Sequence, residues 1–323
     1  MAGALLLLAA ATAPQPTTLE TFQDWIVGCD NGRACQAVAL MPESELEGAT
    51  LVLTRGPAAA SLPEITVTVP DKGRALGVGK RPVPFSTTGA VAAKDVPAIL
   101  DALRRDASLP VLDMAGTRVA SISLAGASAA LLYIDDRQKR VGTTSALVRK
   151  GAAAAVPPPP AVPVIVRPAA TAAPPRTLSQ ADAARQLGDI GCEVDPDALE
   201  PDAVRLDAAH SLALVMQPCG NGAYNYFGAA LIVDEQGKAA PAEFDSSPGM
   251  GDDTHSLVNP AWNDRTGQLE TYAKGRGLGD CGVTSSFAWD GRRFRLAARA
   301  EMGECRGSVD YIPTWRATVQ DAR

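Results

Sequence analysis

The chain has 323 residues, of which 46% are hydrophobic and 20% are charged, a composition typical of globular rather than disordered proteins. The net charge is −6, and residues 177–323 carry 13 basic and 22 acidic side chains, whereas residues 14–150 carry 15 and 14. Because phosphate binding needs clustered Lys and Arg, this balance argues against a nucleic-acid-binding protein.

Residues 1–13, MAGALLLLAAATA, are predicted to be a cleaved secretory signal peptide. A short apolar run from Ala4 to Ala11 precedes Ala-Thr-Ala, which fits the small-x-small cleavage pattern. No Lys or Arg precedes the run, so a buried N-terminal helix is the alternative. No later stretch approaches 18 apolar residues, and we therefore expect an exported protein without a transmembrane segment.

Residues 17–150 are predicted to form a β-rich domain. Strands at 25–30 and 35–40 flank the turn-forming sequence Asp30-Asn31-Gly32, which predicts a hairpin. Alternating apolar residues predict further strands at 51–53, 65–69 and 75–78, and a last one at 141–149.

Two helices are expected within this block. Asp95 is predicted to cap a helix that runs to about Asp106, with apolar residues at i, i+3, i+4 and i+7. The second helix is predicted over Ser123–Gln138, with Asp135 and Asp136 at its exposed end. Two adjacent carboxylates could serve acid–base catalysis, but without a His in this block we interpret them as a solvated helix end.

The stretch Gly151–Arg176 separates the two halves of the chain. Of its 26 residues, 8 are Pro and 9 are Ala, and Pro157–Pro160 form an unbroken run. Since Pro favours polyproline II over helix or central strand, we predict a semi-rigid linker that spaces apart two separately folded domains.

Residues 177–323 are predicted to form an antiparallel β domain with one leading helix at 178–187, capped by Ser179. Asp290-Gly291 predicts a hairpin between two of its strands. The expected strands lie at 211–217, 224–234, 269–274, 282–289, 294–300 and 314–319. The fold class is thus mainly β with a few helices (α+β), as two disulfide-stapled domains joined by the linker.

Six cysteines in an exported chain indicate disulfides. The first block holds two cysteines, so Cys29–Cys35 is the only pairing inside it. The second block holds four, and of three possible connectivities we favour Cys192–Cys219 and Cys281–Cys305.

The sequence Tyr272–Gly282 is unusually rich in glycine. Its G-x-G-x-x-G match precedes a predicted strand rather than a helix, so we do not interpret it as a phosphate-binding loop. Lys274, Arg276 and Asp280 could instead form a small ligand-binding cluster, joined by Arg306 if Cys281 and Cys305 are bonded. The competing interpretation is an internal Arg–Asp pair that only fixes the loop.

Other chemistry-bearing residues carry weaker signals. His210 and His255 have no Cys or carboxylate at zinc-ligand spacing, so we expect neither a metal site nor a cofactor. Trp262, Trp289 and Trp315, with Tyr272 and Tyr311, could line a sugar-binding face, although core packing is the commoner role of such residues.

Three groups of residues carry a resemblance to known proteins: Phe22, Asp24, Trp25, Val27 and Cys29–Asn31 with Cys35; Ile134–Gln138; and Tyr272–Gly282. Together they resemble a family of secreted proteobacterial proteins of unknown function. The first block also resembles the invasion-associated locus B proteins, through Trp25, Cys29 and Cys35. That resemblance implies a periplasmic, non-enzymatic role, in some cases linked to host-cell entry, and it supplies no catalytic residues.

We therefore expect a soluble periplasmic protein that binds a protein or cell-envelope partner without catalysis. The alternative is a small-molecule or glycan-binding module that uses the Lys274–Asp280 loop. A hydrolase that uses His210 or His255 is a third hypothesis.

Overall fold

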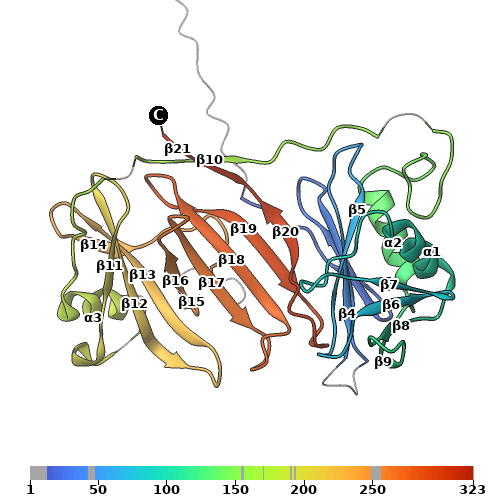
Figure 1. Ribbon diagram of the computed structural model, residues 1–323. Coiled ribbons are helices and arrows are strands. Elements are labelled where there is room, and N and C mark those ends of the chain that lie inside the picture. Colours follow the sequence, from blue (N-terminus) through green and yellow to red (C-terminus); the bar gives the residue numbers. More distant parts are fainter. Residues whose placement is uncertain are drawn as a thin grey trace, which may run out of the picture.

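The computed structural model describes residues 13–42, 48–153, 156–169, 171–189, 191–192, 194–248 and 256–322, with the backbone alone for residues 217–221. The predicted signal peptide therefore lies outside the described residues, apart from Ala13. The fold is mainly β, as predicted, and Figure 1 shows its sheets side by side, with the helices at the two ends. We call residues 13–153 the first lobe and residues 171–322 the second lobe.

The first lobe is built on two antiparallel sheets and two helices. One sheet is a five-stranded meander in the order β1-β2-β3-β4-β5, and the other has the order β7-β6-β8-β9. The meander consists of β1 (Glu20–Phe22), β2 (Trp25–Cys29), β3 (Cys35–Ala39), β4 (Thr50–Arg55) and β5 (Pro63–Thr68). The second sheet consists of β6 (Ala75–Val78), β7 (Arg81–Pro84), β8 (Ser108–Leu112) and β9 (Arg118–Ser123), and the helices are α1 (Val96–Arg105) and α2 (Ala127–Arg137).

Strand β2 is buried on both faces, and this decides how the lobes meet. Trp25 and Val27 point into the core that β2 shares with α1 and α2, whereas Ile26 lies in a separate cluster with residues of the second lobe. Since successive side chains in a strand point to opposite faces, a strand without a polar face needs a cover on both sides. The helices supply one cover, and the second lobe supplies the other.

The helix predictions for this lobe need two corrections at the N-terminal ends of the helices. The N-terminal part of the predicted Ser123–Gln138 helix is strand β9 and a turn, and α2 begins only at Ala127. Gly126 makes that turn with φ of 94°, and a Cβ there would overlap the Phe22 carbonyl oxygen, so only Gly fits. Asp95 precedes α1 without a side-chain capping bond, because its carboxylate accepts from Arg81 at 2.7 Å instead.

Asp135 is buried rather than exposed, and the predicted strand at 141–149 is absent from this described segment. Both errors have one cause. The Asp135 carboxylate accepts hydrogen bonds from the backbone N–H groups of Leu147 and Val148, at 2.8 and 2.9 Å, so the segment satisfies its backbone on a side chain instead of a ladder. Burial raises the pKa of Asp135, against the effect of these bonds and of Arg55.

The second lobe is a pair of sheets with a helix on the outside. β11-β12-β13-β14, with β15 beside β13, faces the sheet β16-β17-β18-β19-β20 across an apolar core. Helix α3 (Gln180–Asp189) covers the other face of β12 and β13. The first sheet consists of β11 (Asp202–Arg205), β12 (His210–Asn221), β13 (Tyr226–Asp234), β14 (Ala239–Pro241) and β15 (Leu257–Val258). The second, called the middle sheet, consists of β16 (Ala261–Asn263), β17 (Gln268–Lys274), β18 (Gly282–Trp289), β19 (Phe294–Met302) and β20 (Ile312–Arg316).

The linker is not a free spacer. Its residues Val164–Arg167 form strand β10, which pairs in parallel with the C-terminal strand β21 (Thr318–Asp321), as the top of Figure 1 shows. Ile165 is buried against Ala288 and Ala297 of the middle sheet. The prediction of two lobes held apart is therefore wrong. The apolar Val-Ile-Val run within the Pro/Ala stretch pairs with strand β21 and packs on the middle sheet.

The two lobes pack directly against each other. Ile26, Val38 and Val52 of the first lobe form one buried cluster with Met302 and Ile312 of the second. Polar contacts surround this cluster. Arg306 donates to Asp24 at 2.6 Å, Arg316 pairs with Asp30 at 2.7 Å, and Asn31 exchanges two hydrogen bonds with the backbone of Arg316.

Two of the predicted disulfides are confirmed. Cys29–Cys35 closes the β2–β3 hairpin, and Cys281–Cys305 ties the start of β18 to the segment after β19. Cys192 is also disulfide-bonded, but the side chain of Cys219 lies outside the described residues, so the Cys192–Cys219 pairing stays a prediction.

Candidate functional site

One face of the middle sheet is open and hollowed. Cross-strand partners point to the same face, and the register aligns Glu270, Ser286, Ala298 and Arg316 in one row across β17–β20. The next row on that face runs from Tyr272 through Thr284 and Ala300 to Pro313. These two rows line a cavity of about 770 Å³, which we call the sheet-face groove.

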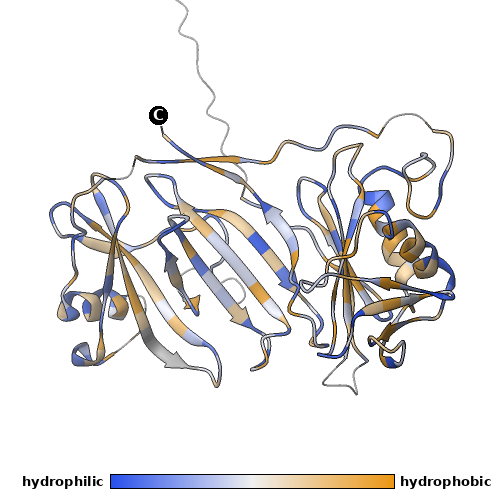
Figure 2. Ribbon diagram, in the orientation of Figure 1, coloured by the Kyte–Doolittle hydropathy of each residue, from blue (hydrophilic) through white to orange (hydrophobic). Residues whose placement is uncertain are grey.

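Small side chains form the floor of this groove. Ala298 and Pro313 are exposed or partly exposed, as are Ser286 and Ala300. In Figure 2 the strands of the middle sheet mix hydrophilic, neutral and hydrophobic residues, as expected where one face covers a core and the other stays open. The centre of the floor is thus formed by short side chains, and the long side chains of Glu270, Tyr272 and Arg316 stand at the ends of the two rows.

The groove ends against the first lobe at one side. Asp30 and Ala34, from the turn closed by the Cys29–Cys35 disulfide, line it beside Arg316. Burial raises the pKa of Asp30, although Arg316 and the N–H groups of Gly32 and Ala34 favour its charged form. This wall exists only because the two lobes are in contact.

At its other end the groove adjoins a hollow of about 440 Å³, which shares Tyr272 and Thr284 with it. Lys274 lines this hollow, and its Nζ lies 5.5 Å from the centre of the Tyr272 ring. Leu278 and Val309 also line it, and they are 69% and 67% exposed.

The loop Gly275–Gly279, which displays Leu278, is fixed by its neighbours. The hydroxyls of Tyr272 and Tyr311 both donate to the Gly279 carbonyl, at 2.7 and 3.2 Å, and the Tyr224 hydroxyl donates to the Gly275 carbonyl at 3.0 Å. Burial, followed by the contact with Tyr272, raises the pKa of Tyr311. The loop is therefore a preformed element rather than a mobile one.

Glycine is required where this loop enters β18. Gly282 has φ of 138°, and a Cβ there would overlap the carbonyl oxygen of Ala273. Residue 282 begins a strand and no helix follows, so the G-x-G-x-x-G string is a close backbone approach, as the sequence indicated.

The structure brings together only part of the predicted cluster. Arg276 forms two hydrogen bonds with the Asp280 carboxylate, which also accepts from the Gly307 N–H at 2.8 Å. The bond from Arg276 is the largest cause of a lowered Asp280 pKa. These two residues thus face each other, and Lys274 alone faces the hollow.

Arg306 does not join the cluster. It points to the first lobe, where it donates to the Met41 carbonyl at 2.8 Å and to Asp24. The bond from Arg306 is the largest cause of the lowered pKa of Asp24. The Cys281–Cys305 disulfide does bring residue 305 beside the loop. The side chain of the next residue, Arg306, lies instead in the interface between the lobes.

His210 and Trp289 both contact the carboxylate of Asp207. His210 Nδ1 lies 2.9 Å from Asp207, which also accepts from the Trp289 indole N–H at 2.7 Å. Burial opposes ionisation of Asp207, but bonds from Trp289, Ala209 and His210 lower its pKa overall. Trp289 is buried in the core, as the commoner interpretation held, and His255 lies outside the described residues.

Sequence reasoning missed the groove itself. Its floor consists of Ala, Ser, Thr and Pro side chains, which give no signal of chemistry in the sequence, and its rows are aligned only by strand register. The Asp30 wall could not be found either, because it joins Asp30 to Arg316, from opposite ends of the chain.

Within the described residues, no helix is both long and apolar enough to cross a membrane, and no three potential ligands are grouped as a metal site.

Comparison with known proteins places the chain in a family. Over 203 residues it is 33% identical to the uncharacterized protein YpfG of Escherichia coli (strain K12), and the aligned region covers 57% of this chain and 56% of that protein. The chain thus matches little more than half the length of that relative. No solved structure matches it. Residues 19–319 match the family described as "Protein of unknown function (DUF1176)", and the chain belongs to that family.

Proposed function

We propose that this is a periplasmic binding protein without catalytic action, which holds an extended, apolar segment of a cell-envelope protein in the sheet-face groove. The observation that carries the proposal is the preformed loop that exposes Leu278, beside the exposed Val309, at the end of an apolar groove. A rigid apolar edge loses little conformational entropy when it binds, which favours affinity for a partner.

Other features support this proposal. Disulfides in both lobes fit an oxidising compartment such as the periplasm. The resemblance of the first lobe to the invasion-associated locus B proteins is consistent with a non-enzymatic role, and we keep it as part of the proposal. Lys274 beside the exposed loop would complement an acidic side chain on the partner.

Site-specific photocrosslinking tests the groove. A photoreactive residue at Ala298 or Leu278, in the mature chain expressed in the periplasm, is expected to give the same discrete adduct at both positions. Met114, which is 90% exposed and lies on the first lobe, is the control position. Identical adducts from Met114, or none from Ala298 and Leu278, would exclude the groove as the binding surface.

The absence of catalysis is tested separately. The purified mature protein is expected to leave peptidoglycan, ester and peptide substrates unchanged. Turnover of any of them that depends on His210 would replace the binding proposal with the hydrolase hypothesis.

A second candidate is a small anionic ligand at Lys274, favoured by the hollow that Lys274 lines with Tyr272 and Tyr311. Lys274→Ala would then abolish binding of a small anion such as citrate while the melting temperature stays nearly unchanged. Equal citrate binding by the variant would exclude this candidate.

A further inference from the structure

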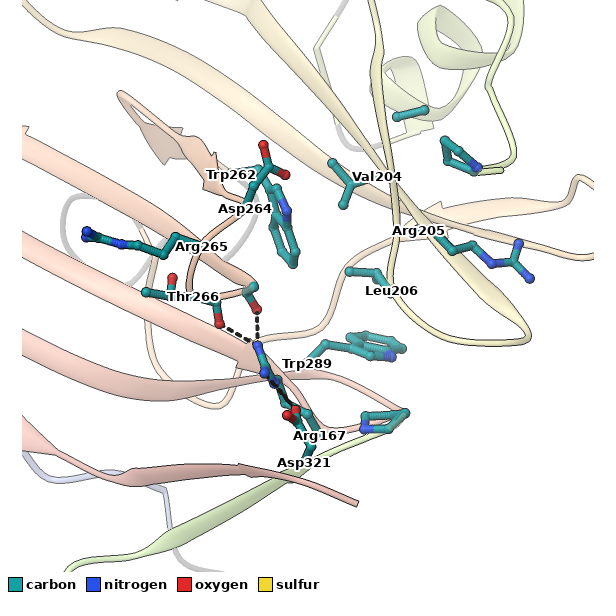
Figure 3. Close-up of a pocket in the computed structure, with 14 residues that line it drawn as sticks. Arg167, Val204, Arg205, Leu206, Trp262, Asp264, Arg265, Thr266, Trp289 and Asp321 are labelled. Atoms are coloured by element: carbon teal, nitrogen blue, oxygen red, sulfur yellow. Dashed lines mark hydrogen bonds and ion pairs between the residues drawn. The ribbon is translucent and has the colours of Figure 1, made fainter. Parts of the chain in front are cut away.

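A second pocket lies on the other side of the middle sheet. It has a volume of about 480 Å³ and lies between β11, the β16–β17 turn and strands β10 and β21. Figure 3 shows Trp262, Trp289 and Arg167 around it, and we call it the tryptophan pocket. Trp262 pairs with Leu269, whose side chain belongs to the core, whereas the groove lies on the opposite face with Glu270.

Trp262 differs from the other tryptophans in its hydrogen bonding. The indole N–H groups of Trp25, Trp289 and Trp315 donate to Ser123, Asp207 and Leu296, respectively. Within the described part of the chain, the N–H of Trp262 has no such acceptor, although the ring is half-buried against the core. This N–H is not one of the described side-chain atoms that are both fully buried and unpaired, so it is reached by solvent and is available to a ligand.

The rim of the tryptophan pocket carries two charges of opposite sign. Asp264 and Arg265 line it, both lie at the surface, and neither side chain forms an ion pair with another described residue. In Figure 3 Asp264 lies beside Trp262, whereas the Arg265 guanidinium points away from the other pocket residues. A carboxylate such as that of Asp264 can accept from two hydroxyl groups. The pocket therefore offers acceptors, donors and an aromatic surface together.

The walls of the pocket are preformed. Arg167 donates to the carbonyl oxygens of Thr266 and Gly267 and bonds to Asp321, as the dashed lines in Figure 3 show. The Gly267 N–H also donates to the Asn263 carbonyl at 2.7 Å. The Trp289 indole is fixed by its hydrogen bond to Asp207. Neither the β16–β17 turn nor Trp289 therefore has to move when a ligand enters the pocket.

We propose that the tryptophan pocket is a saccharide-binding site. A pyranose ring has one apolar C–H face and a rim of hydroxyls that both donate and accept. The C–H face would lie on the Trp262 indole, the hydroxyls would bond to Asp264 and the free indole N–H, and the volume lies within the range of ligand pockets. This site is on the opposite face of the sheet from the groove, so the inference does not depend on the proposed function.

Isothermal titration of the full mature chain with three disaccharides, N,N′-diacetylchitobiose, cellobiose and maltose, tests the proposal. Saturable binding of at least one disaccharide is expected. Trp262→Phe keeps an aromatic ring but removes the N–H, and should weaken binding roughly five- to tenfold. Asp264→Asn should weaken it on the order of tenfold, since the charged acceptor is lost.

Arg265→Ala is the control for Asp264→Asn, because Arg265 is the next residue of the same turn and its guanidinium points away from the pocket in Figure 3. Weakened binding in Asp264→Asn but not in Arg265→Ala supports the proposal. Saturable binding of none of the disaccharides at millimolar concentration overturns it. Binding that is unchanged in both Trp262→Phe and Asp264→Asn also overturns it.

Discussion

At the scale of single residues, the three charged side chains of the glycine-rich loop divide into an Arg276–Asp280 pair that supports the fold and Lys274, which faces the hollow. Asp280 is buried, and it holds both Arg276 and the N–H of Gly307. The Lys274 side chain forms no ion pair with another described residue, and its ammonium group lies over the Tyr272 ring. The loop conformation that exposes Leu278 therefore depends on Asp280.

Asp280→Ala is expected to destabilise the protein by about 2–3 kcal/mol, because the Gly307 N–H loses its acceptor and Arg276 loses its partner. Urea unfolding followed by tryptophan fluorescence measures this loss. Lys274→Ala is the control, and its free energy of unfolding should stay within about 0.5 kcal/mol of the parent. An equal loss in both variants would mean that the pair does not fix the loop.

At the scale of elements, strand β10 shows how a linker becomes part of a domain. Its backbone pairs with β21, and its side chains alternate between burial and exposure: Ile165 is 5% exposed, whereas Val166 is 47% exposed. The same strand carries Arg167, which clamps the turn that lines the tryptophan pocket. Packing of Ile165 thus helps to position a wall of that pocket.

Ile165→Ala is expected to cost about 2–4 kcal/mol of stability, because it leaves a cavity against Ala288 and Ala297. Val166→Ala, one residue away on the exposed face, should change stability by no more than about 0.5 kcal/mol. Thermal unfolding of the two variants gives the comparison. If both behave alike, β10 is not packed on the middle sheet as described.

At the scale of the whole molecule, the lobes are joined by a shared apolar cluster and by polar pairs around it, and not only by the chain. Ile26 and Ile312 are both almost fully buried in this cluster. Arg306 and Asp24 form one of the surrounding pairs. The lobes should therefore stay together when the linker is cut.

A protease site in place of Pro157–Pro160, an exposed part of the linker, allows this test. After cleavage, the two fragments are expected to co-elute as one species in size-exclusion chromatography near neutral pH. Separation of the fragments would show that only the covalent linker joins the lobes.

The Asp24–Arg306 pair should make the association depend on pH. Because Arg306 lowers the pKa of Asp24, this carboxylate strengthens association above its pKa in the separated lobe, and the contribution is lost as the pH falls through the lowered value. Asp24→Asn should therefore weaken the cleaved complex by about 1–2 kcal/mol near pH 7, and the difference from the parent should vanish in acid. Asp30, whose pKa is raised by burial, acts in the opposite direction, but it is common to both proteins and cancels in the comparison. A difference that persists unchanged at acidic pH would contradict the assignment.

The sequence by itself determined the local features. The hairpin around Asp30-Asn31-Gly32, the strands from β2 to β6, helices α1 and α3, most strands of the second lobe and two disulfides follow from periodicity, turn residues and cysteine counts. Each depends on residues that are neighbours in the chain, so the information lies within a short window.

Only the tertiary structure decided which segments pack against each other and which side chains they bury. Burial of Asp135, the non-strand path of residues 141–149, the capture of Arg306 by Asp24 and the pairing of β10 with β21 all join segments that are distant or separately ambiguous. The sheet-face groove and the tryptophan pocket belong to the same class. They are made of ordinary side chains, and they become sites only because strand register and the packing of sheets and lobes bring those side chains to one surface.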